Sequence, residues 1–175
     1  MATFPSSVGI QSMTMRLRAA VARTTSPFTF DQQVVQHQGV RWEAEVTLPP
    51  LTRADAKAVE AFLAVVVRGE SFTLGNPLHD LSGATGTCTG SVGDTSLTTL
   101  SVSGAGNGDY FDINDRLYII TDTTTNSIMP PLRTAGGTCN FSSPQGTWLL
   151  ASNEIEWNID RASIYGFTFA CVESL

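Results

Sequence analysis

The sequence predicts a mainly β fold: a β-sandwich or barrel with one flanking α-helix and a small β-rich inserted domain. Three observations lead to this prediction. Apolar and polar residues alternate in segments near both ends of the chain, which is the pattern of strands with one buried face. One segment, about 52–68, has the period of an amphipathic helix. Between about 80 and 145, Gly, Thr and Ser dominate and the apolar runs are short, as in closely spaced short strands.

Two N-terminal segments have the clearest strand pattern. Residues 40–48 alternate strictly, with Val40 and Trp42 among the inward positions, and residues 13–19 alternate with a basic outer face. Residues 28–36 alternate less cleanly, and they predict either a third strand or one arm of a long hairpin. We expect three of their side chains to point inward: Phe28, Phe30 and Val34.

The helix prediction has a start signal and a stop signal. Pro49-Pro50 ends the preceding strand, and Thr52 with Asp55 forms a capping-box arrangement. Arg68-Gly69 places a cation in the last turn and a glycine at the C-terminus. The apolar stripe that should face the core consists of Val59, Phe62, Leu63 and Val66. After the helix, residues 70–75 read as a strand.

The middle of the chain predicts an insert, so we place a main domain at 1–79 plus 146–175 and a small β domain at 80–145. The strands expected in the insert are 96–102, 110–113 and 117–121, the last two joined by an Asn114-Asp115 turn. Cys88 and Cys139 lie near the two ends of the insert. Reduced thiols are the favoured interpretation, and a pairing between these two cysteines is the alternative.

The C-terminal part returns to strand patterns. Residues 154–159 alternate, with Ile155, Trp157 and Ile159 inward. Residues 165–172 are almost continuously apolar, which predicts a central strand buried on both faces. We expect this last strand to complete the sheet that the first strands begin.

Composition excludes several classes of function. The net charge of −6 disfavours a dedicated nucleic-acid binder, although an acidic surface would let DNA pass without sticking. The N-terminus lacks the features of a signal peptide, and no apolar run is long enough to cross a bilayer. We therefore expect a protein made in the cytoplasm that does not insert into a membrane.

No pattern of residues indicates catalysis or a bound cofactor. A nucleophile would need His37 or His79 as its base, and both lie in loop-like surroundings. A cation loop at Asp109, Asp112, Asn114 and Asp115 lacks the required spacing, so these residues are expected to cap turns. Glu154 and Glu156 could form a glycosidase pair, but a solvated or subunit-facing strand edge explains them better. We therefore predict no enzyme, no metal and no cofactor.

The aromatic residues allow two interpretations. Trp42 and Trp157 lie at core positions of their strands, which favours packing. Tyr110, Tyr118 and Trp148 stay open as a sugar-binding platform, because exposed aromatic faces are what carbohydrate-binding proteins offer.

Several segments resemble the distal tail proteins of bacteriophages with long non-contractile tails. The most distinctive is Val40-Arg-Trp-Glu-Ala-Glu-Val-Thr-Leu-Pro-Pro-Leu-Thr-Arg-Ala-Asp-Ala, continuing to Phe62-Leu63, Arg68-Gly69 and Leu74-Gly75-Asn76-Pro77. Gly108-Asp-Tyr-Phe-Asp-Ile, Arg116-Leu-Tyr-Ile-Ile-Thr-Asp and Pro131-Leu-Arg133 resemble an insert of some members. Residues 150–157 and 164–171 resemble their C-terminal strands. The similar stretches cover about two-thirds of the chain.

The resemblance implies a tail-tube-like β-sandwich, six copies of which close into a ring between the tail tube and the tip hub of the virion. Its partners would then be copies of itself, the tail tube protein and hub proteins, with DNA only in transit through the channel. The residues themselves offer polar strand faces for contacts between subunits. These candidate interface residues are Arg16, Arg18, Glu43, Glu45, Glu154 and Glu156.

Two functions from other classes compete with this one. A receptor- or glycan-binding module would expose the insert tyrosines and Trp148, and it could stay monomeric. A hydrolase would need a cleft that holds His37 or His79 beside a nucleophile.

Overall fold

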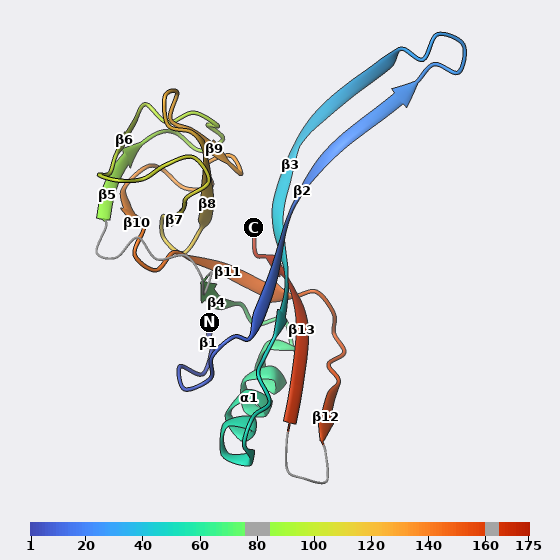
Figure 1. Cartoon of the computed structure of the whole chain (residues 1–175), viewed down its shortest axis with the longest axis vertical. Helices are drawn as coiled ribbons and strands as arrows, with labels where there is room; N and C mark the ends of the chain where they lie inside the picture. The colour runs from blue at the N-terminus through green and yellow to red at the C-terminus, as the bar shows by residue number, and fades with distance from the viewer. Residues whose placement is uncertain (76–84, 160–164) are drawn as a thin grey trace.

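A computed structural model describes residues 1–75, 85–159 and 165–175. The described chain is mainly β with a single helix, α1 (Arg53–Val66), and its strands form two sheets (Figure 1). The first sheet contains β1 (Ala2–Thr3), β2 (Ser12–Thr25), β3 (Gln32–Thr47), β4 (Phe72–Gly75), β11 (Gln145–Leu150), β12 (Trp157–Ile159) and β13 (Tyr165–Glu173). The second contains β5 (Thr85–Thr89), β6 (Thr99–Ser101), β7 (Tyr110–Asp112), β8 (Leu117–Asp122), β9 (Ser127–Met129) and β10 (Thr138–Asn140). The predicted fold class, a β-sandwich with one helix, is confirmed.

The first sheet joins the two ends of the chain, as the sequence predicts. Its strand order is β1-β4-β11-β13-β3-β2, and β12 pairs with the outer part of β13. The last strand therefore lies in the middle of the sheet, between β11 and β3. Its burial differs from the prediction, because Phe167, Phe169 and Cys171 are buried whereas Thr168 and Ala170 are exposed. The strand is central, but only one of its faces is covered.

The alternation in β3 is confirmed position by position over its second half. Val40, Trp42, Ala44, Val46 and Leu48 are all buried. On the paired strand β2, the same face is less well covered: Met13 and Met15 are half-buried and Ala19 is exposed. The core of the first sheet therefore ends near Val40, and the rest of the β2–β3 ladder extends beyond it.

Helix α1 covers the core face of the first sheet with the predicted stripe. Its buried residues are Ala56, Val59, Phe62, Leu63 and Val66. Phe62 packs edge to face against Phe4 and Phe72, with ring centroids 5.5 and 5.2 Å away. Two details differ from the expected caps. The Thr52 hydroxyl donates a hydrogen bond to the Asp55 carboxylate and does not cap a backbone N–H, and Arg68 lies just beyond the last turn.

The second sheet has the order β6-β5-β10-β7-β8-β9 and its own apolar cluster. The predicted strands at 110–113 and 117–121 correspond to β7 and β8, and the predicted turn between them is confirmed, since Asn114 and Asp115 both have positive φ. Strands β5, β9 and β10 have no counterpart in the sequence prediction. The domain boundaries near 80 and 145 stay a prediction.

Strands β5 and β10 pair antiparallel, which brings Cys88 and Cys139 into the same buried cluster as free thiols. A hydrogen bond from the Cys139 thiol lowers the pKa of Cys88 to about 6, and the same contact with burial raises the pKa of Cys139. The two cysteines are therefore free thiols, as the favoured interpretation has it, and they lie in one buried cluster.

Candidate assembly surfaces

The most exposed feature of the molecule is the arm, which we define as residues 20–37 of the β2–β3 hairpin. Figure 1 shows it extending away from both sheets and from α1. For residues 28–36 the sequence predicted either a third strand or one arm of a long hairpin, and the structure contains the hairpin arm. The expected inward positions are wrong, because Phe28 is 91% exposed, Phe30 78% and Val34 55%. The alternation is real, but no second layer of the described chain covers this length of the hairpin.

The arm tip, residues 26–31, is an ordered turn. The Ser26 hydroxyl accepts hydrogen bonds from the backbone N–H groups of Phe28 and Thr29, and the Phe30 N–H donates to the Ser26 carbonyl. Phe30 has φ +59°, a left-handed conformation that is rare for a bulky residue. The tip therefore presents two exposed phenylalanine rings on a hydrogen-bonded turn.

A second candidate surface is the charged face of the first sheet, opposite to its core. It carries Arg16, Arg18, Arg41, Glu43 and Glu45. The sequence suggested that opposite charges on different strands could meet a neighbouring subunit. In the structure they already pair within the chain, since Arg18 contacts Glu43 at 3.4 Å and Arg16 contacts Glu45 at 3.5 Å. A role in the subunit interface stays a prediction for these residues.

Glu43 is the centre of the charged face. Its Oε1 accepts hydrogen bonds from Arg41 Nε at 3.1 Å and Nη2 at 2.8 Å, in addition to the contact with Arg18. The hydrogen bond from Arg41, with a further contribution from Arg18, holds the pKa of Glu43 below its ordinary value. The face is therefore a set of compensated charges and does not present one sign to a partner.

A cleft of about 470 Å³ lies at the root of the arm, between β3 and the second sheet. We define the cleft by its lining: Gln36, His37, Val40, Val92, Gly93, Thr95, Met129, Pro131, Leu132 and Arg133. The walls are mainly apolar, and Val92 stands 67% exposed at one side. His37, a residue that a hydrolase would need, belongs to this lining.

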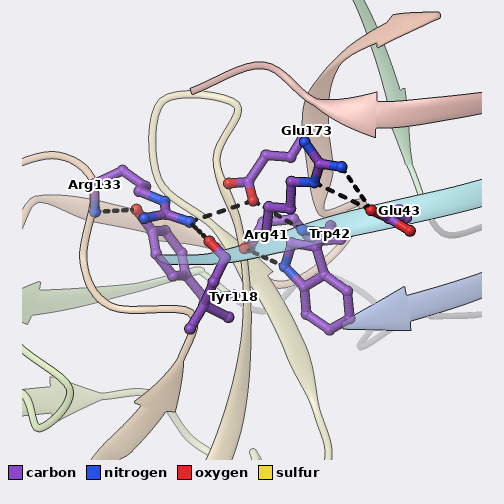
Figure 2. A network of polar contacts seen from close by, with 8 residues as sticks. Arg41, Trp42, Glu43, Tyr118, Arg133 and Glu173 are labelled. Carbon is purple, nitrogen blue, oxygen red and sulfur yellow. Dashed lines mark hydrogen bonds and ion pairs between the residues drawn. The ribbon is translucent and has the colours of Figure 1, made fainter. Parts of the chain in front are cut away.

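The second sheet is fixed to the first by a buried network around Trp42 and Glu173 (Figure 2). The Glu173 carboxylate accepts a hydrogen bond from the Trp42 backbone N–H at 3.0 Å and lies 3.5 Å from Arg133 Nη2. Arg133 also donates to the Val40 carbonyl, and its backbone N–H donates to the Tyr118 hydroxyl at 2.8 Å. Because Arg133 and Tyr118 belong to the second sheet and its loops, these bonds set the position of that sheet over β3.

Further contacts complete this junction. The Trp42 indole donates to the Leu117 carbonyl at 2.9 Å, and its ring packs 5.9 Å from that of Tyr110. Leu117 belongs to the apolar core of the first sheet. Asp112 in β7 accepts from the Gln145 N–H at the start of β11. The β7–β8 hairpin therefore covers the core face of the first sheet beside Trp42.

Most of the aromatic platform proposed for glycans is not on the surface. Trp148 is 1% exposed and its indole donates to the Leu74 carbonyl, and Tyr118 is fully buried. Tyr110 is half-buried against Trp42. A sugar platform needs exposed rings, so this prediction is wrong for Trp148 and Tyr118. Trp157, which we expected in the core, is instead 39% exposed and packs beside Phe167.

Glu154 and Glu156 are exposed, but they precede the short strand β12 and do not lie on a strand as predicted. Their place in a subunit interface remains a prediction.

Comparison with known proteins adds nothing to these assignments. No family model and no curated protein matches this chain.

The residues weighed for chemistry are placed in structural roles. Asp112 accepts hydrogen bonds from the Asn140 side chain at 2.8 Å and the Gln145 N–H at 2.9 Å, and Asp109 accepts from the Gly106 N–H. The bond at Asp109 confirms the predicted turn-capping role. Asp112 instead joins β7 to β10 and to the start of β11, which the sequence did not predict. His79 lies outside the described residues. In the part of the chain that the structure describes, no three His, Cys, Asp or Glu side chains gather as metal ligands, and no helix has the length and hydropathy to cross a bilayer.

Sequence reasoning missed Arg133 and Glu173, which join the two sheets. Glu173 follows an apolar run at the C-terminus and looks like a solvated strand end, and Arg133 lies in a Pro-rich loop. One signal was available. Glu173 is in phase with Phe167, Phe169 and Cys171, so extending the predicted strand by one residue places its carboxylate on the core face.

Proposed function

We propose that this chain is a structural virion protein that forms a homohexameric ring at the distal end of a bacteriophage tail. The ring would join the tail tube to the tip hub or baseplate and leave a channel for DNA. Its partners would be its own copies, the tail tube protein and hub proteins, and its role would be structural and not catalytic. The arm carries the proposal. Its two strands are paired, but its apolar side chains pack on nothing within the described chain.

An isolated two-stranded hairpin in water is marginally stable, and exposed apolar side chains usually mark an interaction site. The arm has both properties. It is a two-stranded ladder with Phe28, Phe30, Val34 and Val35 in solvent. Assembly with a neighbouring chain would bury these side chains and support the ladder.

The first sheet also offers an edge. Strand β2 lies at one end of the strand order, so its outer N–H and C=O groups have no neighbour among the described strands. Such an edge pairs readily with another chain. The resemblance of residues 40–77 to distal tail proteins supports the choice of a ring at the tail tip over other assemblies.

Electrostatics are compatible with a channel. A chain with net charge −6 gains no counterion release from a duplex, so DNA could pass without being retained. The glycan-binding alternative loses support, because Trp148 and Tyr118 are buried.

The test is the oligomeric state of the full chain. Mass photometry and negative-stain images over a range of concentrations should show closed rings with about six times the 18.7 kDa mass of one chain. Localisation of the chain in the intact particle by cryo-electron microscopy should place the ring between tube and tip. A single copy of the chain in the particle, with the arm in solvent, would contradict the proposal.

A further inference from the structure

The arm tip and the cleft have complementary properties. We propose that the cleft binds the arm tip of a neighbouring copy, with Phe28 and Phe30 as its buried anchors. This inference rests on the proposed ring function and names the contact that would close the ring.

The first argument is the chemistry of the two surfaces. The tip presents two phenylalanine rings and the carboxylate of Asp31. The cleft presents apolar walls from Val40, Val92 and Leu132 and the side chains of Arg133 and His37, and the lining that the structure describes includes no acidic residue. Its volume of about 470 Å³ is in the range of pockets that enclose aromatic groups.

The second argument is the backbone of the tip. Phe30 adopts φ +59°, where glycine or asparagine would fit at lower cost, and its side chain packs on nothing that would repay the strain. A phenylalanine at this position therefore destabilises the isolated chain. Burial of its ring against another molecule would offset this cost.

The third argument is reach. The β2–β3 ladder continues to the pair Thr25 and Gln32, so the two strands stay paired up to the tip. Gln36, the cleft residue nearest to the tip along β3, is four residues from Gln32, which is roughly 13 Å of extended strand. Figure 1 shows the end of the arm pointing away from the second sheet, so a tip that enters the cleft must come from another copy.

The fourth argument is symmetry. Tip and cleft are different surfaces at opposite ends of the arm, so a contact between them is head to tail. Such a contact repeats from copy to copy and closes into a ring when the rotation between copies is suitable. Each copy then donates one tip and receives one.

The direct experiment is photo-crosslinking. The full chain with benzoylphenylalanine in place of Phe28 is mixed, isotopically light with heavy, and irradiated after assembly. We expect cross-linked peptides that join position 28 of a light chain to residues 92–95 or 129–133 of a heavy chain, or the reverse. Cross-links to another surface or to another protein, with rings intact, would overturn the cleft assignment and leave the ring function in place.

Matched variants give a second measurement. Phe28→Ser should weaken assembly about thirtyfold, as truncation of a central aromatic anchor does. Val92→Glu, which adds a charge at the cleft, should weaken assembly by at least about tenfold. Val65→Glu is the control, because Val65 is also an exposed valine but lies on α1. Circular dichroism confirms that each variant folds.

The outcomes separate the two hypotheses. Equal assembly of Val92→Glu and Val65→Glu would refute the tip-in-cleft contact alone. A wild-type chain that is solitary both in solution and in the particle would refute the contact together with the ring.

Discussion

At the scale of single residues, Asp112 is the clearest case of a polar side chain that organises the fold. Only 7% exposed, it accepts hydrogen bonds from Asn140 in β10 and from the Gln145 N–H at the start of β11. Burial raises the pKa of Asp112 and outweighs the opposing effect of these donors. The carboxylate thus links the second sheet to the first, at an energetic cost that depends on its charge.

This cost predicts a dependence on pH. Because the folded-state pKa is raised, the contribution of Asp112 to stability is full below the ordinary carboxyl pKa, about 4, and is lost as the pH rises through the raised value. Asp112→Asn can keep an acceptor oxygen and removes the ionisation. We expect the stability of this variant relative to wild type to improve as the pH rises from about 3 to 7.

Urea unfolding at several pH values measures the difference. A constant gap between wild type and Asp112→Asn across that range would contradict the assignment. Asp112→Ala serves as the comparison, because it removes the acceptor as well and leaves two donors unpaired. It should cost about 2–4 kcal/mol at low pH. Because it also removes the ionisation, this cost should decrease as the pH rises, in parallel with Asp112→Asn.

Trp148 shows why sequence patterns did not find some buried residues. Its strand reads QGTWLL, without alternation, and the segment follows a Ser- and Pro-containing loop. Its burial comes from pairing with Phe72 on one side and Glu173 on the other, which are distant in sequence. Periodicity describes one strand at a time, so it cannot reveal a position that two remote neighbours enclose.

At the scale of elements, helix α1 was predicted within a few residues and strand β3 only over its second half, whereas the arm was predicted only as one of two alternatives. The helix has local signals: a proline stop, a Thr–Asp pair and a glycine at positive φ. The arm has the alternation of a half-buried strand without a cover in its own chain. A pattern can predict that a face is apolar, but it cannot say which molecule covers that face.

The arm should be separable from the fold. Val21 and Gln36 are partners across the ladder, so residues 22–35 can be replaced by an Asn-Gly turn that closes the shortened hairpin. Since the deleted side chains are mostly exposed, we expect the midpoint of thermal unfolding to change by only a few degrees. Assembly should be lost.

Differential scanning calorimetry and mass photometry on the same sample test both parts. Loss of the cooperative transition would mean that the arm stabilises its own chain, and unchanged assembly would exclude the arm from the interface. The Val65→Glu variant again provides a surface change that should affect neither measurement.

At the scale of the whole molecule, the position of the second sheet depends on the junction at Arg133 and Glu173. Glu173 has a side chain only 4% exposed, and the Arg133 guanidinium is the cation beside it. Removing one member of a buried ion pair leaves an uncompensated charge, which is more costly than removing both. The cleft depends on the same junction, because Arg133 and Val40 belong to its lining.

A double-mutant cycle tests this role. Arg133→Met should cost about 3–5 kcal/mol, because it strands the Glu173 carboxylate, while Glu173→Gln keeps an acceptor for the Trp42 N–H and should cost less. The double variant should be more stable than the sum predicts, with a coupling energy of about 1–3 kcal/mol.

The matched control is the pair Arg18 and Glu43, whose atoms lie 3.4 Å apart, nearly the same separation as in the junction. Arg18 is 69% exposed, so solvent screens this pair and its coupling should stay below about 1 kcal/mol. Equal coupling in both cycles, measured by denaturant unfolding, would mean that the junction pair is energetically an ordinary surface contact. In that case the second sheet would be held in place mainly by other contacts, such as those of Trp42 with Leu117 and of Asp112 with Gln145.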